Sequence, residues 1–363
     1  MAASRDAEYM QLALELAERA RGRTSPNPMV GAVIVKDAQI VGRGYHKRAG
    51  MPHAEINALA EARDNARGAT LYVNLEPCCH YGRTSPCTQE IIKAGIKRVV
   101  FALTDPNPVV SGQGARELRK AGIKINFGIL RRESELLNEV YLKYITTGRP
   151  FVILKTAQTL DGRIAAVSGD SRWVTGSKAR RLVHRLRSEC DAVGVGVGTV
   201  NIDNPELTVR LIKGPNPYRL IISAGAAFSK SIKLFKNNSD ARTIVATSAS
   251  TAASLKLKNI IVWSVKKGRG GVSLDDLLDK AGRFGITSLL IEGGNRLATS
   301  LLKEGLVDKH YIFIAPKIIG KGINAVGDLA LKRMADAISY RNAHYYTEYE
   351  PDLLFVGYPK RSK

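Results

Sequence analysis

Apolar and polar residues in the first part of the chain follow two alternating patterns. Segments with an apolar residue every three or four positions indicate helices, and short runs rich in Val, Ile, Leu and Phe indicate strands. The expected helices cover residues 6–21, 53–67, 87–94, 115–121 and 131–144. The expected strands are a hairpin over 30–45 and runs at 69–75, 98–103 and 123–127. This alternation predicts a layered α/β sheet.

The alternation begins again after residues 146–150, Thr-Thr-Gly-Arg-Pro, which reads as a domain boundary. Further strands are expected at 151–157, 192–197, 219–223, 243–247, 260–265, 288–291 and 311–315. Further helices are expected at 177–187, at 274–284 and from about residue 296. A chain of 363 residues can form two ordinary domains with real cores. We therefore expect two α/β domains, residues 1–147 and 148–363.

Composition narrows the class of protein. With 44% hydrophobic and 24% charged residues, the chain is typical of a soluble globular protein. Residues 1–11 lack the apolar run of a signal peptide, and no uncharged apolar stretch reaches the ~18 residues of a membrane helix. Three of the four cysteines lie between 78 and 87, which favours a metal site over disulfides. We expect a cytoplasmic protein with no membrane partner, in which Cys190 is an inert core thiol.

The formal net charge of +22 raises the question of a nucleic-acid partner. Most of the excess positive charge lies after residue 147, and the first half has no basic stripe interleaved with aromatic residues. The same charge can steer small phosphorylated molecules to the protein. We therefore expect a phosphorylated small-molecule substrate and no nucleic acid.

Four residues carry the clearest chemistry. His53, Cys78 and Cys87 supply one imidazole and two thiols, and Glu55 is a carboxylate two residues from the histidine. Zinc deaminases use this set, with one His and two Cys on the metal and a Glu that moves protons without touching it. Zinc lowers the pKa of a bound water far below that of bulk water, to about 7, which a reaction with water at neutral pH requires. We assign Glu55 as the catalytic proton carrier.

The spacing of the thiols leaves alternatives open. The common deaminase signature places two residues between its cysteines, whereas eight separate Cys78 from Cys87, with Cys79 in between. Adjacent side chains diverge, so Cys79 is interpreted as an idle thiol, and His80 as a loop or substrate contact rather than a ligand. A purely structural zinc site would use the same ligands, but it would not need Glu55.

Two glycine-rich segments lie in the second half. Gly194–Thr199 resembles a dinucleotide-binding loop but has Thr199 where a third glycine belongs. Glu292-Gly293-Gly294-Asn295 lies between an expected strand and an expected helix, where main-chain N–H groups can meet a phosphate. A tight strand-to-helix turn would explain the second segment equally well.

Together these segments resemble the bifunctional riboflavin-biosynthesis deaminase/reductase family over nearly the whole chain. The first half is similar at 26–31 (Pro-Asn-Pro-Met-Val-Gly), 44–55 and 76–87, and the second at 155–163, 171–175, 199–210 and 292–294. In that family the eight-residue gap between the cysteines is normal, which favours Cys78 and Cys87 beside His53. The resemblance implies a cytidine-deaminase-like three-layer domain followed by a dihydrofolate-reductase-like domain.

The resemblance also implies the residues of a reductase site. NADPH would be held by Ala157, Trp173, Thr199, Asp203, Ser223, Gly294, Asn295, Arg296, Leu297, Ala298, Thr299 and Ser300. The sugar phosphate substrate would be held by Lys155, Ser171, Arg187, Leu207, Arg210 and Glu292. Because a guanidinium binds a phosphate with two parallel bonds, Arg187 and Arg210 suit the phosphate. Lys155 and Asp161 would orient or protonate the sugar oxygen. For any one of these four charged residues taken singly, a solvated surface charge or an ion pair is the alternative interpretation.

The family reaction is deamination of a diaminopyrimidinone that carries ribosylamino 5-phosphate, followed by NADPH-dependent reduction of its ribosyl group to ribityl. We expect a homo-oligomer, a dimer or a tetramer. A competing hypothesis is a nucleic-acid base deaminase whose basic C-terminal half grips phosphates, with affinity falling steeply as salt rises. A third is a binding protein in which zinc only stabilises the fold.

Overall fold

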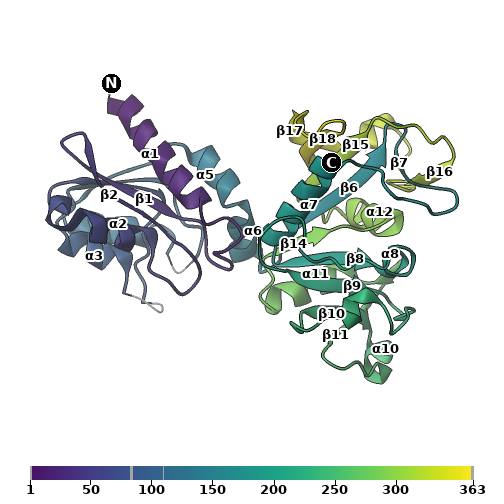
Figure 1. The fold of residues 1–363 in the computed structure, drawn as a ribbon. Coiled ribbons are helices and arrows are strands. Elements are labelled where there is room, and N and C mark those ends of the chain that lie inside the picture. Colours follow the sequence, from purple (N-terminus) through teal and green to yellow (C-terminus); the bar gives the residue numbers. More distant parts are fainter. Residues whose placement is uncertain (1, 82–84, 109, 361–363) are drawn as a thin grey trace. The chain divides into compact units, whose positions relative to one another are not determined.

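The structure, a computed structural model, describes residues 2–81, 85–108 and 110–360. The chain divides into two compact units, Met1–Gly148 and Arg149–Lys363, and each has its own sheet and its own core (Figure 1). Part of the cysteine motif, residues 82–84, lies outside the described residues.

The first unit is built on a sheet with strand order β2-β1-β3-β4-β5. Its strands are β1 (Gly31–Lys36), β2 (Gln39–Tyr45), β3 (Thr70–Leu75), β4 (Arg98–Leu103) and β5 (Lys124–Phe127). The pairs β1–β2 and β1–β3 are antiparallel, whereas β3, β4 and β5 run parallel. The hairpin and these strands were predicted from the apolar runs and are confirmed, with bounds that differ by a residue or two.

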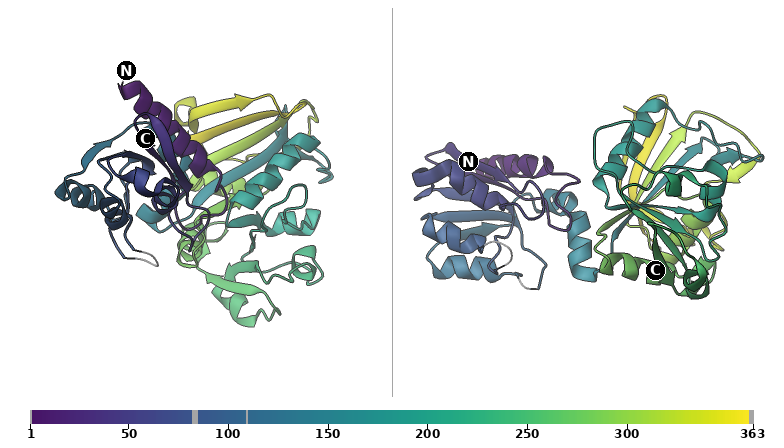
Figure 2. Two further views of the ribbon diagram at one scale, coloured as in Figure 1. Left: turned by 60° about the vertical axis from the view of Figure 1, so that its left-hand side comes forward. Right: turned by 60° about the horizontal axis from the view of Figure 1, so that its bottom comes forward.

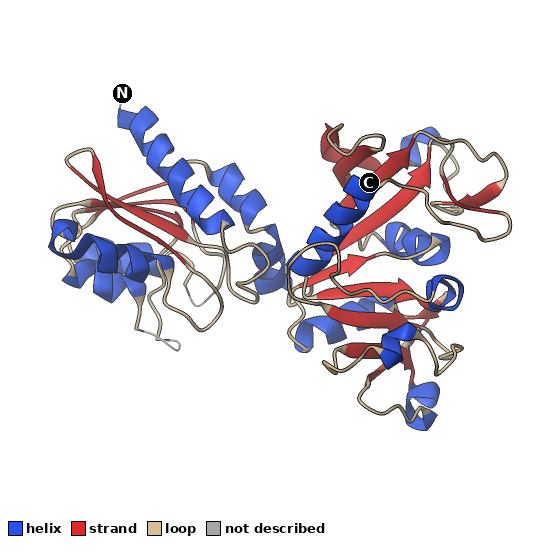
Figure 3. Cartoon of the chain, in the orientation of Figure 1, coloured by secondary structure: helices blue, strands red, loops and turns tan. Residues whose placement is uncertain are grey.

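Helices cover both faces of this sheet, as Figure 3 shows. They are α1 (Ala2–Glu18), α2 (Ala54–Ala62), α3 (Cys87–Lys93), α4 (Gln113–Lys120), α5 (Arg131–Leu137) and α6 (Glu139–Thr147), with a 3-10 turn η1 (Arg63–Ala66). Alternation along β1 separates two cores, because successive side chains in a strand point to opposite faces. Ala32 and Ile34 pack with α2 and α3, whereas Val33 and Val35 pack with α1. The result is a three-layer unit.

One helix prediction is wrong. Residues 131–144 were expected to form a single helix, but the structure breaks it at Asn138 into α5 and α6. The Asn138 side chain accepts a hydrogen bond from the main-chain N–H of Met29 at 2.8 Å and donates to its carbonyl oxygen at 3.0 Å. A tertiary contact that residue periodicity cannot show therefore sets the break.

The second unit has a long sheet with strand order β11-β10-β9-β8-β14-β6-β15-β18-β17. Its strands are β6 (Phe151–Thr159), β8 (Ala192–Gly196), β9 (Tyr218–Ile222), β10 (Thr243–Ser248), β11 (Ile261–Val265), β14 (Ser288–Ile291), β15 (Lys309–Ala315), β17 (Ser339–Tyr346) and β18 (Leu353–Lys360). The strands from β11 to β15 run parallel, and β18 and β17 join antiparallel at the edge. Figure 2 shows these yellow C-terminal strands continuing the sheet.

Helices flank this sheet as well. They are α7 (Ser177–Glu189), α8 (Val197–Asp203), α9 (Lys233–Lys236), α10 (Ala249–Ser254), α11 (Leu274–Arg283) and α12 (Asn295–Glu304), with a 3-10 turn η2 (Met334–Asp336). Short ribbons β7 (Arg163–Ala166) with β16 (Gly322–Asn324), and β12 (Lys267–Gly268) with β13 (Gly271–Val272), lie outside the main sheet. The short ribbons, helices α8, α9 and α10, and strands β17 and β18 were not predicted. Edge strand β17 is almost wholly exposed, so it has no apolar period to read.

Candidate active sites

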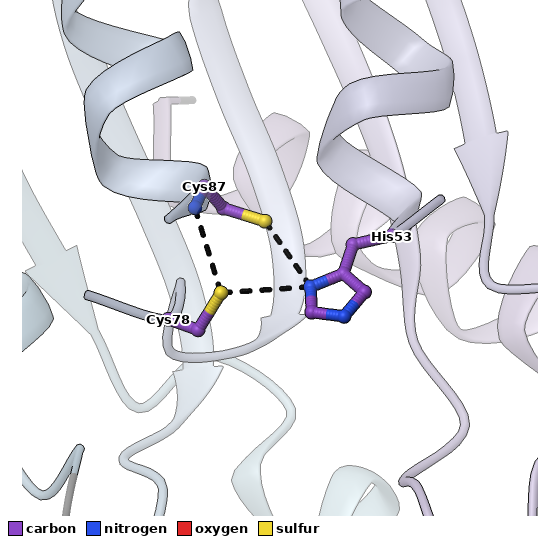
Figure 4. Close-up of side chains that lie close together, drawn as sticks. All are labelled: His53, Cys78 and Cys87. Carbon is purple, nitrogen blue, oxygen red and sulfur yellow. Dashed lines mark hydrogen bonds between the residues drawn. The ribbon is translucent and has the colours of Figure 1, made fainter. Parts of the chain in front are cut away.

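The expected metal ligands of the first unit converge on one point (Figure 4). His53 is the residue before α2, Cys87 is the first residue of α3, and Cys78 lies in the loop after β3. One ligand atom from each lies within 4.8 Å of the other two. Close packing fixes the histidine, because a Cβ at Gly44 on β2 would lie only 2.2 Å from the carbonyl oxygen of Ala54.

The distances fit zinc. Nδ1 of His53 lies 3.3 Å from Sγ of Cys87 and 3.5 Å from Sγ of Cys78. A tetrahedral zinc with Zn–N near 2.0 Å and Zn–S near 2.3 Å would separate such atoms by about 3.5 Å. The main-chain N–H of Cys87 also donates to Sγ of Cys78 at 3.5 Å, as a thiolate ligand favours. A hydrogen bond from Cys87, followed by one from His53, lowers the pKa of the Cys78 thiol to about 4.

Cys79 and His80, the other two possible ligands in this motif, lie outside the group of converging ligand atoms. Among the described residues the ligand group is His53 with Cys78 and Cys87, and it includes neither Cys79 nor His80. His80 instead lines the cavity beside the ligands.

Glu55 occupies the position that a proton carrier needs. It is the second residue of α2, it is only 3% exposed, and burial raises the pKa of its carboxyl to about 7. Its carboxylate lines the same cavity as His53 and Cys78. A buried carboxyl beside the metal position can hold and release a proton near neutral pH.

Two of the expected ligands, His53 and Cys78, line a cavity of about 490 Å³. Polar side chains that the sequence analysis did not assign to a site line it as well: Asn27, His46, Asp105, Asn107 and Tyr141. The amide nitrogen of Asn27 contacts Nε2 of His46 at 3.1 Å, and the Tyr141 hydroxyl donates to the Asp105 carboxylate at 2.9 Å. Burial raises the pKa of the Asp105 carboxyl.

A sequence signal for Asp105 and Asn107 was present. Both follow the end of β4, and Glu76 follows the end of the neighbouring parallel strand β3, so all three lie at one edge of the sheet. The buried Glu76 carboxylate accepts hydrogen bonds from main-chain N–H groups of the following loop, at 3.0 Å from Gly112 and 2.9 Å from Ala115. It therefore shapes the loop that carries the cavity wall.

A charged cluster forms in the second unit. Lys155 on β6 and Glu292 directly after β14 lie side by side because these strands are parallel neighbours, and their charged atoms are 3.9 Å apart. Asp203 at the end of α8 acts on the Lys155 charge as well. Burial lowers the pKa of Lys155. Burial alone would raise the pKa of Glu292, but the charge of Arg187, its hydrogen bonds and the charge of Lys155 together outweigh burial and lower that pKa.

The Arg187 guanidinium is hydrogen-bonded to groups within the protein. Its Nε and Nη2 donate to the two carboxylate oxygens of Glu292 at 2.5 and 3.0 Å, and its Nη1 donates to the carbonyl oxygen of Thr208 at 3.1 Å. Two residues expected to touch substrate thus bind each other. The side chain of Arg210 is 46% exposed and remains accessible to a phosphate, although Nη1 donates to Oγ1 of Thr208.

The two glycine-rich segments meet. A Cβ at Gly294 would lie 3.3 Å from Oγ1 of Thr199, so the loop before α12 touches the start of α8. Both loops follow neighbouring parallel strands, β14 and β8, at the edge where open α/β sheets bind ligands. Glycine next to a helix N-terminus leaves room for a pyrophosphate, so this cradle fits a dinucleotide.

The remaining expected cofactor and substrate residues vary in exposure. Trp173 is 64% exposed and stacks under the Arg180 guanidinium at 4.4 Å, and Ser171 donates to Asp203 at 3.3 Å. By contrast Ala298, Ser223 and Leu207 are buried.

The position of Asp161 argues against a role as proton donor. Its carboxylate accepts hydrogen bonds from Thr159 Oγ1 at 2.6 Å and from the Gly320 N–H at 2.7 Å. These bonds, that from Thr159 first, lower its pKa. Asp161 therefore fixes the loop after β6 as a carboxylate.

Comparison with known proteins identifies the family. Residues 3–103 match the model of the cytidine and deoxycytidylate deaminase zinc-binding region, and residues 150–346 match that of the RibD C-terminal domain. The riboflavin biosynthesis protein RibD of Aquifex aeolicus is 47% identical, over 93% of this chain and 94% of its own length. This chain belongs to the RibD family. The RibD of Escherichia coli, 39% identical over 93% of this chain and 95% of its own, agrees.

Solved RibD structures share the whole architecture. One from Acinetobacter baumannii has a TM-score of 0.89 and 36% identity, covering 99% of this chain and 100% of its own. One from Thermotoga maritima, described as a diaminohydroxyphosphoribosylaminopyrimidine deaminase/5-amino-6-(5-phosphoribosylamino)uracil reductase, has a TM-score of 0.87 and 38% identity over the same shares. The predicted α/β fold, with a deaminase-like part before a reductase part, is confirmed.

Family membership decides between the competing hypotheses. The protein is a bifunctional deaminase and reductase of riboflavin biosynthesis, with a zinc-binding deaminase region and an NADPH-using reductase domain. The nucleic-acid base deaminase and the zinc-stabilised binding protein are thereby set aside. Within the described part of the chain, no helix combines the length and apolar character needed to cross a membrane.

Proposed function

We propose that residues 1–147 carry out the deamination and residues 148–363 the reduction. The division of the chain between Gly148 and Arg149 and the spans of the two family models support this assignment. The substrate of the first reaction would be 2,5-diamino-6-(5-phosphoribosylamino)pyrimidin-4-one. Its deaminated product would be the substrate of the second.

His53, Cys78 and Cys87 would hold zinc. The observation that carries this proposal is the convergence of one imidazole nitrogen and two sulfurs, at the spacing of tetrahedral zinc, on a cavity that Glu55 also lines. Bound zinc supplies an acidified water and a Lewis acid at this point.

Glu55 would move the protons of the deamination. Its carboxylate takes one proton from the attacking water and passes it to a ring nitrogen. It then takes the remaining proton of the added hydroxyl and gives it to the amine, so that the C=O bond forms, the C–N bond breaks and ammonia leaves. The buried position of Glu55 keeps bulk water from supplying these protons. The cavity wall at Asn27, Asp105 and Asn107 would hydrogen-bond the polar edges of the pyrimidine and its ribose.

In the second unit, Lys155 would hydrogen-bond the sugar oxygen next to the carbon that is reduced. NADPH supplies the hydride. Burial lowers the pKa of Lys155, so its ammonium can release a proton more readily than an exposed lysine. Glu292, held by Arg187, would keep Lys155 in place, and Arg210 would bind the substrate phosphate.

The cradle of Thr199 and Gly294 would hold NADPH, with Asp203, Asn295 and Trp173 at its rim. Arg296, Leu297, Thr299 and Ser300 belong to the first turns of α12, behind that cradle. Ala298 and Ser223 are buried, so any contribution from them would come through packing or main-chain atoms. Ala157, two residues beyond Lys155 on β6, would lie beside the nicotinamide.

We also propose a cytoplasmic homo-oligomer. Cys78, Cys79, Cys87 and Cys190 are free thiols, which a reducing compartment preserves. Exposed apolar side chains in the second unit, such as Met334 at 90% and Ile318 at 75%, offer surface for a second copy. Light scattering after size-exclusion chromatography tests the oligomeric state, and a monomer at micromolar concentration would contradict it.

Glu55→Gln tests the deaminase assignment. We expect the purified variant to retain its zinc, measured by elemental analysis, while ammonia release falls by about a hundredfold or more, because the amide cannot carry a proton. Ammonia release at the wild-type rate would remove Glu55 from the mechanism. Loss of zinc together with activity would show that Glu55 holds the site rather than moving protons.

A further inference from the structure

The loop that carries Arg210 is held by side chains at successive main-chain groups. Residues 204–210 have no regular secondary structure. The carbonyl oxygen of Thr208 accepts from Arg187 at 3.1 Å, and the N–H of Val209 donates to Oδ1 of Asn216 at 2.8 Å. An irregular loop fixed in this way can present a side chain in one position.

His184 on α7 holds the next main-chain group of this loop by a hydrogen bond. Its Nδ1 accepts a hydrogen bond from the main-chain N–H of Arg210 at 2.9 Å, and the N–H of Leu211 points to the same nitrogen at 3.5 Å. The imidazole is only 6% exposed. His184 therefore binds the main chain at the residue whose guanidinium is to meet the substrate phosphate.

This contact requires a neutral imidazole. Two N–H groups point at Nδ1, so this nitrogen must carry a lone pair rather than a proton. Burial, with the charges of Arg187 and Arg210 against the opposing charge of Glu292, lowers the pKa of His184 to about 4. The ring is thus an uncharged acceptor between two cations.

We propose that His184 is a positioning residue of the reductase, whose unprotonated Nδ1 holds the main chain at Arg210 so that the guanidinium faces the substrate phosphate. This inference rests on the proposed role of Arg210. His184 touches neither the reacting carbon nor the cofactor in this account. Its loss should therefore affect binding of the phosphorylated substrate and leave the chemical step intact.

Leucine and asparagine give a matched pair of variants. Both branch at Cγ as histidine does, but only asparagine places an acceptor oxygen near the position of Nδ1. We expect His184→Leu to raise KM for the phosphorylated substrate about tenfold, with kcat within about twofold, because two N–H groups lose their acceptor. His184→Asn should restore most of that KM.

Two further measurements separate positioning from general damage. KM for NADPH and ammonia release by the first unit should stay at wild-type values in both variants. KM for the same substrate without its phosphate should not respond to His184→Leu. If the leucine variant does not fold, His184→Gln replaces it, since its amide reaches the Nε2 position and should not rescue.

The variant Arg210→Ala distinguishes two outcomes: that His184 does not position Arg210, and that Arg210 does not bind the phosphate. The double variant His184→Leu/Arg210→Ala should bind the phosphorylated substrate no more weakly than Arg210→Ala alone. If Arg210→Ala leaves KM unchanged, the proposed role of Arg210 fails, and this inference with it. If Arg210→Ala raises KM but leucine and asparagine at position 184 behave alike, only the role of His184 is overturned.

Discussion

The two sites of this chain are assembled in different ways. The proposed metal ligands come from 35 consecutive positions, between His53 and Cys87, and lie where two helices begin and one strand has just ended. The reductase cluster draws Lys155, Asp203 and Glu292 from three elements spread over 138 positions. The first is a local motif, whereas the second exists only because parallel strands end at one edge of a sheet.

The forces that hold the two sites differ as well. In the first unit, close packing and main-chain contacts fix the proposed ligands, and a metal would complete the site. In the second, buried charges hold one another, with Arg187 bound to Glu292 by two hydrogen bonds. Removing one partner should therefore have different consequences in the two units.

Loss of a metal ligand should have the largest effect. Cys87→Ser is expected to lose zinc and to reduce ammonia release by about a thousandfold or more, because the acidified water disappears with the metal. NADPH oxidation on the separately supplied deaminated substrate should be unchanged. Zinc content and the two assays are measured on one preparation.

Cys79→Ser is the matched control for this experiment, since Cys79 neighbours Cys78 but stands outside the ligand group. It should keep its zinc and its activity. Loss of zinc in the Cys79 variant alone would mean that the ligand set has been misassigned.

Truncating the buried charge cluster should come next. Glu292→Gln leaves Arg187 and Lys155 without their carboxylate, which typically costs about 3–5 kcal/mol when a buried pair is broken. We expect reductase activity and the denaturant midpoint of the second unit to fall together, while ammonia release persists. Glu206→Gln, at a partly exposed ion pair with Arg210, should change the midpoint little. Equal midpoints for the two variants would contradict the stabilising role of Glu292.

Substitutions in the cavity wall of the first unit should reduce deamination by a smaller factor. Asp105→Asn removes the charge that the Tyr141 hydroxyl binds, and it should lower kcat/KM of deamination about tenfold with zinc retained. Tyr141→Phe, which leaves the carboxylate but removes its partner, should cost less. A Tyr141 variant as impaired as the Asp105 variant would indicate that the hydrogen bond, and not the carboxylate, carries the effect.

The effect expected to be smallest at neutral pH is a dependence of stability on acid. His310 on β15 contacts Thr156 Oγ1 at 3.1 Å and the Tyr340 hydroxyl at 2.8 Å, and burial lowers its pKa to about 3. The unfolded chain takes up a proton below about pH 6.5, whereas the folded chain resists it. The contribution of neutral His310 to the free energy of unfolding is fully present above about pH 6.5. It falls as the pH falls toward 3, by up to about 1.4 kcal/mol per pH unit.

His310→Asn should flatten this slope between pH 6.5 and 4 in urea unfolding. His344→Asn, on the exposed strand β17, controls for the loss of a histidine. An unchanged slope in the His310 variant would show that its proton uptake does not differ between the folded and unfolded chain.

Much of the fold was predictable because its signals are local. The apolar run 98–103 is strand β4 to the residue, and the helix that begins at Cys87 follows from Pro86. The split of α5 and α6 at Asn138 was missed, because the cause is a contact with Met29 far away in the sequence. Strand β17 was missed because its edge position removes the apolar alternation.

In the candidate sites, too, local features could be predicted and long-range contacts could not. The chemistry of His53, Glu55, Cys78 and Cys87 can be recognised from residue types and spacing. Two contacts depend instead on which elements the sheet brings together. One is the hydrogen bond from Arg187 to Glu292, and the other is the hydrogen bond from the main chain of Arg210 to His184. Residue type alone could not distinguish Arg187 from Arg210.

The central claim is that one chain carries two separate catalytic centres. It is tested most directly by assaying Glu55→Gln and Lys155→Met for both reactions, with each substrate supplied independently. The account predicts complementary losses: the first variant oxidises NADPH at the wild-type rate but releases little ammonia, and the second does the reverse. Loss of both reactions in either folded variant would contradict it.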